Sequence, residues 1–426
     1  MISKKNIAAT NVIFLVGFLL SANITLAQPF VLDRSLKVEH LVEVPFKPTN
    51  MAFIDHDDIL ILDRDEGKVY RILDYRMKLE PLLDVNIATI GYRGMLGIDT
   101  LTAKDNVTYV FLYYTESVGK DGDDDLDQAG LDPLGNRLYR YQLKDGKLIN
   151  PKLLLDLPVR PGPRHTGGEV AIGPDSNIYL TVGDMDGTFK KPFETIAQNY
   201  LNVTALDGRS GILRVTPDGK PVDDGILGNQ FPLNLYFAYG IRNSFGLDWD
   251  PITGNLWDTE NGPHYGDEIN LVEPGFNSGW VKVQGIWTPN FDNLGEVSLE
   301  PKGLVDFNGK GKYSKPEFTW ILPVAPTALK FFSSTVYGPE YENDLFVADA
   351  NTGSIYHFEL NYNRNGLLLQ GPLDDQIATD MEEMKEIIFA EGFGRTTDMQ
   401  VGPDGNLYIL TSSEKGANIH RIIRTN

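Results

Sequence analysis

Short runs of apolar or alternating residues recur along the chain, separated by turns rich in glycine, proline, asparagine and aspartate. Runs of this length between P-D-G, T-G and D-G turns are typical of β-strands. Helical periodicity is scarce, and only residues 380–389 (DMEEMKEIIF) favour a helix. The pattern therefore predicts an all-β protein.

Six segments share one plan: a strand, a tight turn, and a second strand that ends in acidic or small residues. They begin at Met51, Met95, Glu169, Phe245, Leu329 and Met399. Six units give about 65 residues each, more than common propeller repeats have, so long inter-strand loops are expected. Radially repeated sheets form a β-propeller, an arrangement that leaves few exposed strand edges. We predict a six-bladed β-propeller with long inter-strand loops, with a seven-bladed ring as the alternative. We also expect strand candidates at residues 35–44 and 418–424 to share one blade and close the ring.

The N-terminal segment has the layout of a secretory signal peptide. Lys4 and Lys5 precede an apolar run at residues 12–20, and small residues follow as far as Ala27. We expect cleavage after Ala27, a secreted or extracytoplasmic location, and one domain over residues 28–426; an uncleaved anchor is the alternative. No other segment reaches transmembrane length, so no membrane span is expected in the mature chain. With no cysteine, the chain forms no disulfide and carries no lipid on a thiol.

The chain is strongly acidic, with a formal net charge of −21 that becomes −23 once Lys4 and Lys5 are removed. Such a surface repels nucleic acids and anionic membranes and attracts cations. Residues 121–127 (DGDDDLD) are dense in carboxylates, but they lack the spacing and closing glutamate of a calcium hand. We interpret them as an acidic insertion, and whether they bind a cation stays open.

Two loop segments hold the candidate chemistry. His165 lies in R-H-T-G-G within residues 161–184, and a neutral histidine is the usual side chain for removing a proton from an alcohol. Arg242, within residues 239–280, precedes S-F-G, where an arginine can stabilise negative charge that develops on an oxygen. Taken alone, either residue could instead be structural.

A glycine-proline corner follows in the second segment. The carbonyls of Gly262 and Pro263 lie outside a regular ladder, and hard cations such as Ca²⁺ accept carbonyl oxygens as ligands. Asp267 and Glu268 could add carboxylates, although paired acids after a turn are often simply solvated. The chain has no nucleophile elbow and no phosphate-binding glycine loop, which argues against a serine hydrolase or a nicotinamide enzyme.

At these residues the chain resembles the glucose/sorbosone dehydrogenase family. The motifs I-R-N-S-F-G-L, E-N-G-P and D-E-I-N-L-V follow one another in order, and the likeness extends from about residue 44 to residue 423. Its other dense parts are residues 164–184, 320–327 and 395–411. The best-known members are soluble six-bladed propellers that oxidise sugars with pyrroloquinoline quinone (PQQ) and Ca²⁺. The resemblance therefore implies the same fold, cofactors and reaction here.

The resemblance also implies a role for individual residues. His165 matches the base that accepts the sugar hydroxyl proton, and Arg242 and Asn243 match residues that contact the carbonyl side of PQQ. The other matched positions are the Ca²⁺ ligands Gly262 and Pro263 through their carbonyls, the neighbouring Asp267, and the structural Ca²⁺ ligands Glu268 and Ser278.

The resemblance implies four further cofactor-facing positions, and three of them depart from the family pattern. Tyr92 stands where soluble sugar dehydrogenases have a glutamine, and Asn351 stands where they have a lysine. Of two arginines before the last P-D-G turn only Arg395 remains, because the second position is Thr397. The base and the metal corner are thus retained, while the cations that would pair with the PQQ carboxylates are reduced in number.

The leading hypothesis is an exported PQQ- and Ca²⁺-dependent enzyme that oxidises a sugar or related alcohol and passes electrons to an external acceptor. The alternative is a cofactor-free propeller that binds glycans or proteins at the cell surface, which the identities of Tyr92, Asn351 and Thr397 favour. A Ca²⁺-dependent lactonase is a third hypothesis, weaker because the acidic ligand quartet of such enzymes is not evident.

Overall fold

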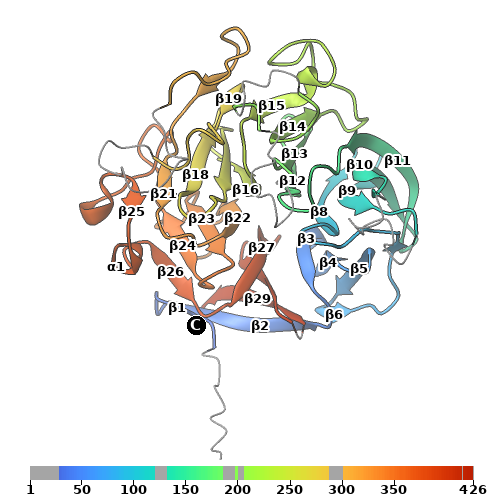
Figure 1. Ribbon diagram of the computed structural model, residues 1–426. Helices are drawn as coiled ribbons and strands as arrows, with labels where there is room; N and C mark the ends of the chain where they lie inside the picture. The colour runs from blue at the N-terminus through green and yellow to red at the C-terminus, as the bar shows by residue number, and fades with distance from the viewer. Residues whose placement is uncertain are drawn as a thin grey trace, which may run out of the picture.

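The computed structural model describes residues 28–119, 132–185, 197–199, 206–286, 301–414 and 416–425. The predicted signal peptide at residues 1–27 and the acidic run at residues 121–127 lie outside these ranges. Strands dominate the described residues and form six sheets arranged around a common centre (Figure 1). The prediction of an all-β propeller is confirmed.

The first three sheets along the chain come from its N-terminal half. The first contains β3 (Pro48–Asp55), β4 (Asp58–Asp63), β5 (Lys68–Leu73) and β6 (Arg76–Met77), with β7 (Leu83–Asp84) also paired to β5. The second contains β8 (Met95–Thr102), β9 (Thr108–Glu116), β10 (Gly135–Lys144) and β11 (Lys147–Leu157). The third contains β12 (Val170–Ile172), β13 (Ile178–Val182), β14 (Gly211–Val215), β15 (Tyr236–Tyr239), β19 (Phe276–Asn277) and β20 (Lys312–Tyr313).

The remaining three sheets complete the circle. The fourth contains β16 (Ser244–Trp249), β17 (Leu256–Glu260), β18 (Asp267–Val272), β21 (Phe318–Trp320) and β25 (Ile377–Ala378). The fifth contains β22 (Pro326–Phe331), β23 (Leu345–Asp349), β24 (Ile355–Phe358), β26 (Ile388–Glu391) and β1 (Phe30–Val31). The sixth contains β27 (Arg395–Val401), β28 (Leu407–Ser412), β29 (Ala417–Arg424) and β2 (Leu36–Val44).

Each repeated sequence segment supplies the first two strands of one sheet. The first strands are β3, β8, β12, β16, β22 and β27; each contacts the next, and β27 contacts β3. Figure 1 shows these strands lining the centre of the molecule. The strand-turn-strand repeat thus marks the innermost strand pair of every sheet.

The two ends of the chain meet in the sixth sheet. β2 pairs antiparallel with β29, from Leu36 opposite Arg424 to Val44 opposite Ala417, and Figure 1 shows the two strands side by side. The expected pairing of residues 35–44 with 418–424 is confirmed. Hydrogen bonds between the chain ends therefore join the last sheet to the start of the chain.

Helix is almost absent from the described residues, which contain the short α1 (Met381–Met384) and two 3₁₀ turns, η2 (Leu233–Leu235) and η3 (Gly371–Leu373). The helix expected over residues 380–389 is therefore only partly right. Asp380 caps α1, accepting hydrogen bonds from the backbone N–H groups of residues 382 and 383, but the chain enters β26 at Ile388. Phe389 is buried in a hydrophobic cluster there, so sheet pairing and burial override the local helical pattern.

No helix in the described ranges has the length and hydropathy needed to cross a membrane.

The core consists of hydrophobic layers between neighbouring sheets. One layer, for example, joins Trp257 of the fourth sheet to Phe331 and Val347 of the fifth. Another joins Ile61 of the first sheet to Ile419 of the sixth. Because every sheet buries both faces against its neighbours, strands such as β4 contain an uninterrupted run of apolar residues.

Charged side chains occupy the centre of the ring. Asp99, Asp248 and Asp398 lie on three different sheets and Glu169 directly precedes β12, and the Lys330 ammonium interacts electrostatically with all four carboxylates. Burial raises the pKa of Asp99 to about 6, while Lys330 and nearby backbone N–H groups oppose the rise. Lys330 therefore supplies positive charge where several buried carboxylates would otherwise repel one another.

Replacement of Lys330 with methionine should destabilise the protein by about 3 kcal/mol near pH 7, because it leaves buried carboxylates without this counter-charge. The folded-state pKa of Asp99 lies above its unfolded value, so protonation between about pH 7 and pH 4 favours the folded state. Loss of Lys330 removes an interaction that lowers the Asp99 pKa, so the folded variant takes up the proton at higher pH than wild type and gains more stability from it; the loss should therefore shrink as the pH falls through this window. Urea unfolding at pH 7.5 and pH 5 measures both effects, with Lys104→Met in an exposed turn as the control. Equal losses in the two lysine variants would contradict this account.

Candidate functional site

The predicted site residues lie at one end of the innermost strands. His165 and Arg242 come shortly before the first strands β12 and β16, while the Gly262–Pro263 corner follows the second strand β17. A second strand runs antiparallel to the first, so the residues after it return to the end where the first strand begins. This geometry brings loops from several sheets to one face of the propeller.

His165 is held at the entrance to β12 by a strained turn. Its backbone has a φ of 51°, and Gly167 after it has a φ of 66°. A side chain at Gly167 would place its Cβ 2.3 Å from the carbonyl oxygen of Thr181, so only glycine fits. The H-T-G-G sequence thus turns the chain sharply and fixes the imidazole, which is 6 % exposed.

Asp184, at the end of the second strand of the same sheet, fixes the ring of His165. The His165 Nδ1 atom lies 2.6 Å from Asp184 Oδ1. With the proton on Nδ1, Nε2 carries the free lone pair. Burial lowers the pKa of His165, and Arg242 and Arg164 lower it further, while Asp184 acts in the opposite direction. The imidazole is therefore neutral near pH 7 and can accept a proton.

Trp280 and Arg242 extend this pair toward the Gly262–Pro263 corner. The indole Nε1 of Trp280 donates to Asp184 Oδ2 at 2.6 Å, and the Arg242 guanidinium lies 5.4 Å from the centre of the Trp280 ring. Arg242 also donates from Nη1 to the carbonyl of Asn261 at 2.7 Å. The His165 imidazole, the Asp184 carboxylate, the Trp280 indole and the Arg242 guanidinium therefore form one connected set.

Asn243 has a structural part in this set. Its Oδ1 accepts a hydrogen bond from the backbone N–H of Gly167 at 3.2 Å, and its carbonyl accepts one from Asn261 at 2.9 Å. The side chain is almost fully buried. Asn243 thereby ties the His165 turn to the strand that leads into the Gly262 corner.

The Gly262–Pro263 corner fits a hard cation by the chemistry of its donors. Asp267 braces it, accepting hydrogen bonds from the backbone N–H groups of Gly262 at 2.8 Å and Ala325 at 2.7 Å. Burial raises the pKa of Asp267 to about 6, against the lowering effect of these two donors. Within the described ranges, neither the Gly262 nor the Pro263 carbonyl accepts a hydrogen bond. Free carbonyl oxygens in a braced turn are suitable Ca²⁺ ligands.

Glu268 and Ser278 lie deeper, in a buried acidic cluster. Glu268 on β18 stands directly opposite Glu260 on β17, and the Ser278 hydroxyl donates to Glu260 Oε2 at 2.6 Å. Glu268 Oε1 already accepts hydrogen bonds from Gln284 Nε2 at 2.9 Å and from the Gly285 N–H at 2.5 Å. Burial raises the pKa of Glu268 to about 8. In the part of the chain that the structure describes, no group of three or more His, Cys, Asp or Glu side chains has a geometry suited to a metal ion.

The remaining cofactor candidates are spread around the same face. Tyr92, half exposed, belongs to a loop that contacts the His165 turn, since its carbonyl accepts the Thr166 hydroxyl at 3.0 Å. Asn351 is exposed and donates to the Pro323 carbonyl at 3.0 Å. Arg395 and Thr397 lie on β27, and in the described structure neither hydrogen bonds to another predicted site residue.

Two contributors, Asp184 and Trp280, received no role from sequence reasoning. Both end the loop segments that hold the candidate chemistry, and Asp184 follows a second strand as the Gly262 corner does. The position of an acid directly after a buried strand was the available signal for Asp184. No local pattern could pair Trp280 with it, because 96 residues separate the two side chains.

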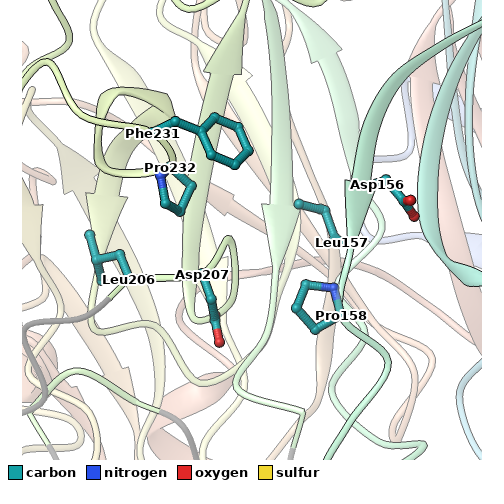
Figure 2. A pocket seen from close by; sticks show the side chains of 7 residues that line it. All are labelled: Asp156, Leu157, Pro158, Leu206, Asp207, Phe231 and Pro232. Carbon is teal, nitrogen blue, oxygen red and sulfur yellow. The ribbon is translucent and has the colours of Figure 1, made fainter.

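A surface pocket of about 430 Å³ lies apart from these residues (Figure 2). Its lining consists of Asp156, Leu157, Pro158, Leu206, Asp207, Phe231 and Pro232. Both carboxylates in this pocket are paired, with Asp156 Oδ1 2.9 Å from Arg137 Nε and Asp207 bonded to Arg209. The pocket thus offers no free charged group for chemistry.

Comparison with known proteins places the chain among sugar dehydrogenases. The family model described as glucose/sorbosone dehydrogenase matches residues 46–424. The aldose sugar dehydrogenase YliI of Escherichia coli (strain K12) is 26% identical over 253 residues, which cover 59% of this chain and 58% of that protein. Quinoprotein glucose dehydrogenase B of Acinetobacter calcoaceticus is 29% identical over 252 residues, which cover 56% of this chain and 51% of that protein. The matches thus span little more than half the length of these two relatives.

Solved structures share the fold. The PQQ-bound form of an aldose sugar dehydrogenase from Streptomyces coelicolor superposes with a TM-score of 0.64 at 21% identity, covering 91% of this chain and 98% of that one. The apo-form of the soluble aldose sugar dehydrogenase from Escherichia coli has a TM-score of 0.66 at 21% identity, covering 92% of this chain and 100% of that one. At this identity the likeness concerns the fold.

Replacement of Asp267 with asparagine should loosen the metal corner, because an amide NH₂ would face one of the two backbone N–H donors. The expected loss is about 1 to 3 kcal/mol of unfolding free energy, the cost of an unsatisfied buried polar group. Urea unfolding in the presence of a chelator measures it without any contribution from bound metal. Asp145→Asn, in an exposed turn, is the matched control. An unchanged unfolding midpoint in Asp267→Asn would rule out the bracing role.

Proposed function

The chain belongs to the glucose/sorbosone dehydrogenase family and is an oxidoreductase of the sugar dehydrogenase type. On that premise we propose that it is an exported enzyme that oxidises the hydroxyl group of a sugar or related alcohol with PQQ and Ca²⁺. The observation that carries the proposal is the connected set on one face of the propeller. There a buried His165–Asp184 pair is linked through Trp280 and Arg242 to the carbonyl corner at Gly262.

His165 acts as the base in this proposal. Asp184 holds the proton on Nδ1, so Nε2 is available for the proton of the substrate hydroxyl. Burial and the nearby arginines keep the ring neutral before reaction, while Asp184 stabilises the imidazolium that forms after proton transfer. The surrounding residues thus serve the unprotonated and the protonated forms of His165 at different stages.

PQQ, when bound, supplies the acceptor for the hydride that leaves the carbon bearing the substrate hydroxyl. The carbonyls of Gly262 and Pro263 would hold the Ca²⁺ ion beside it, with Asp267 keeping the corner rigid. Arg242 brings a fixed positive charge to the same side, suited to stabilising negative charge on an oxygen. Asn243 orients the His165 turn through Gly167.

Several finer assignments belong to the same proposal. Each of the six sheets is one blade of a six-bladed ring, and residues 28–426 form a single domain. A signal peptide directs the chain out of the cytoplasm and is removed by cleavage after Ala27, and an external acceptor would reoxidise the cofactor. Glu268 and the Ser278 carbonyl would hold a second, structural Ca²⁺, and Arg395, Tyr92, Asn351 and Thr397 would face the cofactor.

A second function, a cofactor-free module that binds glycans or proteins at the cell surface, is favoured by one observation. Where the family resemblance implies cationic partners for PQQ, this chain presents the neutral Asn351 and Thr397, and Asn351 is exposed. Titration with PQQ, with and without a chelator, separates the two functions. Absence of binding at micromolar cofactor would leave the binding module as the better assignment.

His165→Gln should abolish turnover while leaving PQQ binding intact, because glutamine cannot accept the hydroxyl proton. The expected fall in kcat is about 10²- to 10⁴-fold. Dye reduction with a panel of aldoses measures kcat, and absorbance measures bound cofactor. The matched control is His357→Gln, which removes a similar histidine whose Nε2 lies 2.8 Å from Asp344 Oδ2 in the fifth sheet. Equal turnover in both variants would refute His165 as the base.

Positive charge introduced at Asn351 and Thr397, where the family resemblance implies cations, should tighten PQQ binding. For Asn351→Lys combined with Thr397→Arg, we expect a gain of about tenfold in affinity, or roughly 1.4 kcal/mol, because PQQ carries three carboxylates. The measurement is a PQQ titration at two salt concentrations, since a charge effect must weaken as salt rises. The control is a double variant with the same charge change at exposed residues elsewhere, Asn229→Arg with Gln230→Lys. If that control gains as much affinity, net charge alone accounts for the effect.

A further inference from the structure

Asp184 is a carboxylate with no exposed surface, and it is hydrogen-bonded through both oxygens. Oδ1 lies 2.6 Å from His165 Nδ1, and Oδ2 accepts the Trp280 indole N–H at 2.6 Å. A buried anion is stable only when charged or polar donors replace the water it has lost. The Trp280 bond therefore bears directly on the charge state of the His165–Asp184 pair.

The backbone around Trp280 is held firmly enough to aim the indole. Its N–H donates to the Gly240 carbonyl at 3.0 Å, and its carbonyl accepts from Asn199 Nδ2 at 3.0 Å. Asn199 is itself bonded to Asn277 at 2.8 Å, on the strand that leads to Trp280. The side chain is 5 % exposed. A fixed N–H donor on a buried side chain loses little conformational entropy when it bonds.

The groups that face this pair differ in their effect. Arg242 and Arg164 disfavour the protonated form of His165, and Asp184 favours it. Arg242 also lies over the Trp280 ring, with its guanidinium carbon 5.4 Å from the ring centre. Trp280 thus touches the carboxylate that orients the base and the cation that opposes its protonation.

We propose that Trp280 is a positioning residue that holds Asp184 ionised and aimed at His165, so that the pair stays free of an additional proton at neutral pH. The catalytic consequence rests on the proposed function, since it assumes that His165 is the base. The binding geometry and the titration of the pair do not depend on that assumption. Trp280 acts through Asp184 and is therefore distinct from the residues that touch substrate or cofactor.

The direction of the effect follows from charge. The Trp280 N–H stabilises the Asp184 anion most when the pair carries a net negative charge, with a neutral imidazole and an ionised carboxylate. An added proton on either partner neutralises the pair and weakens that interaction. Loss of the donor must therefore raise the pKa at which the pair takes up this proton. Loss of the carboxylate charge must do the reverse to His165.

The central variant is Trp280→Phe, which keeps an aromatic ring and removes the N–H. NMR titration of histidine-labelled protein without cofactor should show the His165 midpoint rising by about one pH unit, the size expected for one hydrogen bond to a charged group. Asp184→Asn should move the midpoint downward. The control is Trp257→Phe, because the Trp257 indole N–H is also buried but has no hydrogen-bond partner in the described structure. It should leave the midpoint unchanged.

Wild-type protein supplies a test that needs no variant to fold. The Trp280 indole N–H resonance should shift with pH at the same midpoint as His165. An unresponsive indole, or a Trp280→Phe midpoint equal to that of wild type, would overturn the inference.

Activity adds an independent comparison. The acidic limb of kcat/KM in Trp280→Phe should move to higher pH by the same amount, so that the loss of rate is greatest in acid and recovers in alkali. A uniform loss of rate at every pH would argue for a merely structural role and against the inference. Wild-type protein that shows the NMR behaviour but no PQQ-dependent turnover would refute the proposed function and support the positioning role.

Discussion

Antiparallel pairing of the first two strands, repeated in every sheet around a closed circle, is the constraint on which this molecule depends. It returns the chain to the end where each innermost strand begins, so the loop before β12 meets the loop after β13, and the loop before β16 meets the loop after β17. The pairing of β2 with β29 completes the circle through hydrogen bonds between the chain ends. Residues far apart in sequence share one face for this reason.

Buried charge is the second recurring theme. Four carboxylates surround Lys330 at the centre, and Glu260 on β17 faces Glu268 on β18 near the Gly262–Pro263 corner. Like charges directly opposite one another destabilise a sheet unless donors, protons or a cation compensate them. Backbone N–H groups and amide side chains supply part of this compensation, as they do for Glu268. The acidic composition of the chain is thus partly an internal feature as well as a surface property.

The site combines a rigid part with a permissive part. His165, Asp184 and Asn243 are buried and bonded to one another or to their neighbouring turns, so substitutions there disturb several contacts at once. Tyr92 and Asn351 are exposed on loops, where a change of side chain costs little stability. The departures from the family pattern among the cofactor-facing residues include such exposed positions. The structure therefore offers a physical reason why, under the family resemblance, the buried His165 and Asn243 would be retained while exposed positions such as Tyr92 and Asn351 depart from the pattern.

Local signals in the sequence determined the class of fold and most of the candidate positions. Alternating apolar runs with P-D-G and D-G turns predict strands because the two-residue period of side chains and the turn geometry are local properties. The same is true of the H-T-G-G turn, where only glycine fits beside Thr181. The expected helix over residues 380–389 was only partly right because its pattern is local, whereas the pairing of β26 with β24 is not. The family likeness rests on the order of short motifs along the chain, and this order can be read from the sequence without the structure.

Only the tertiary structure decided which of those positions touch. The Asp184–Trp280 bond, the Lys330 cluster and the contact between the Tyr92 loop and the His165 turn join residues from different loops and sheets. Such contacts arise from the closure of the ring and the packing of neighbouring sheets, and no window of sequence contains them. The sequence determined which chemical groups are present at the ends of the strands. The closed circle of sheets determined that they meet. Closure by the β2–β29 hydrogen bonds fixes the position of each innermost strand around the axis, and therefore the positions of the loops at its end.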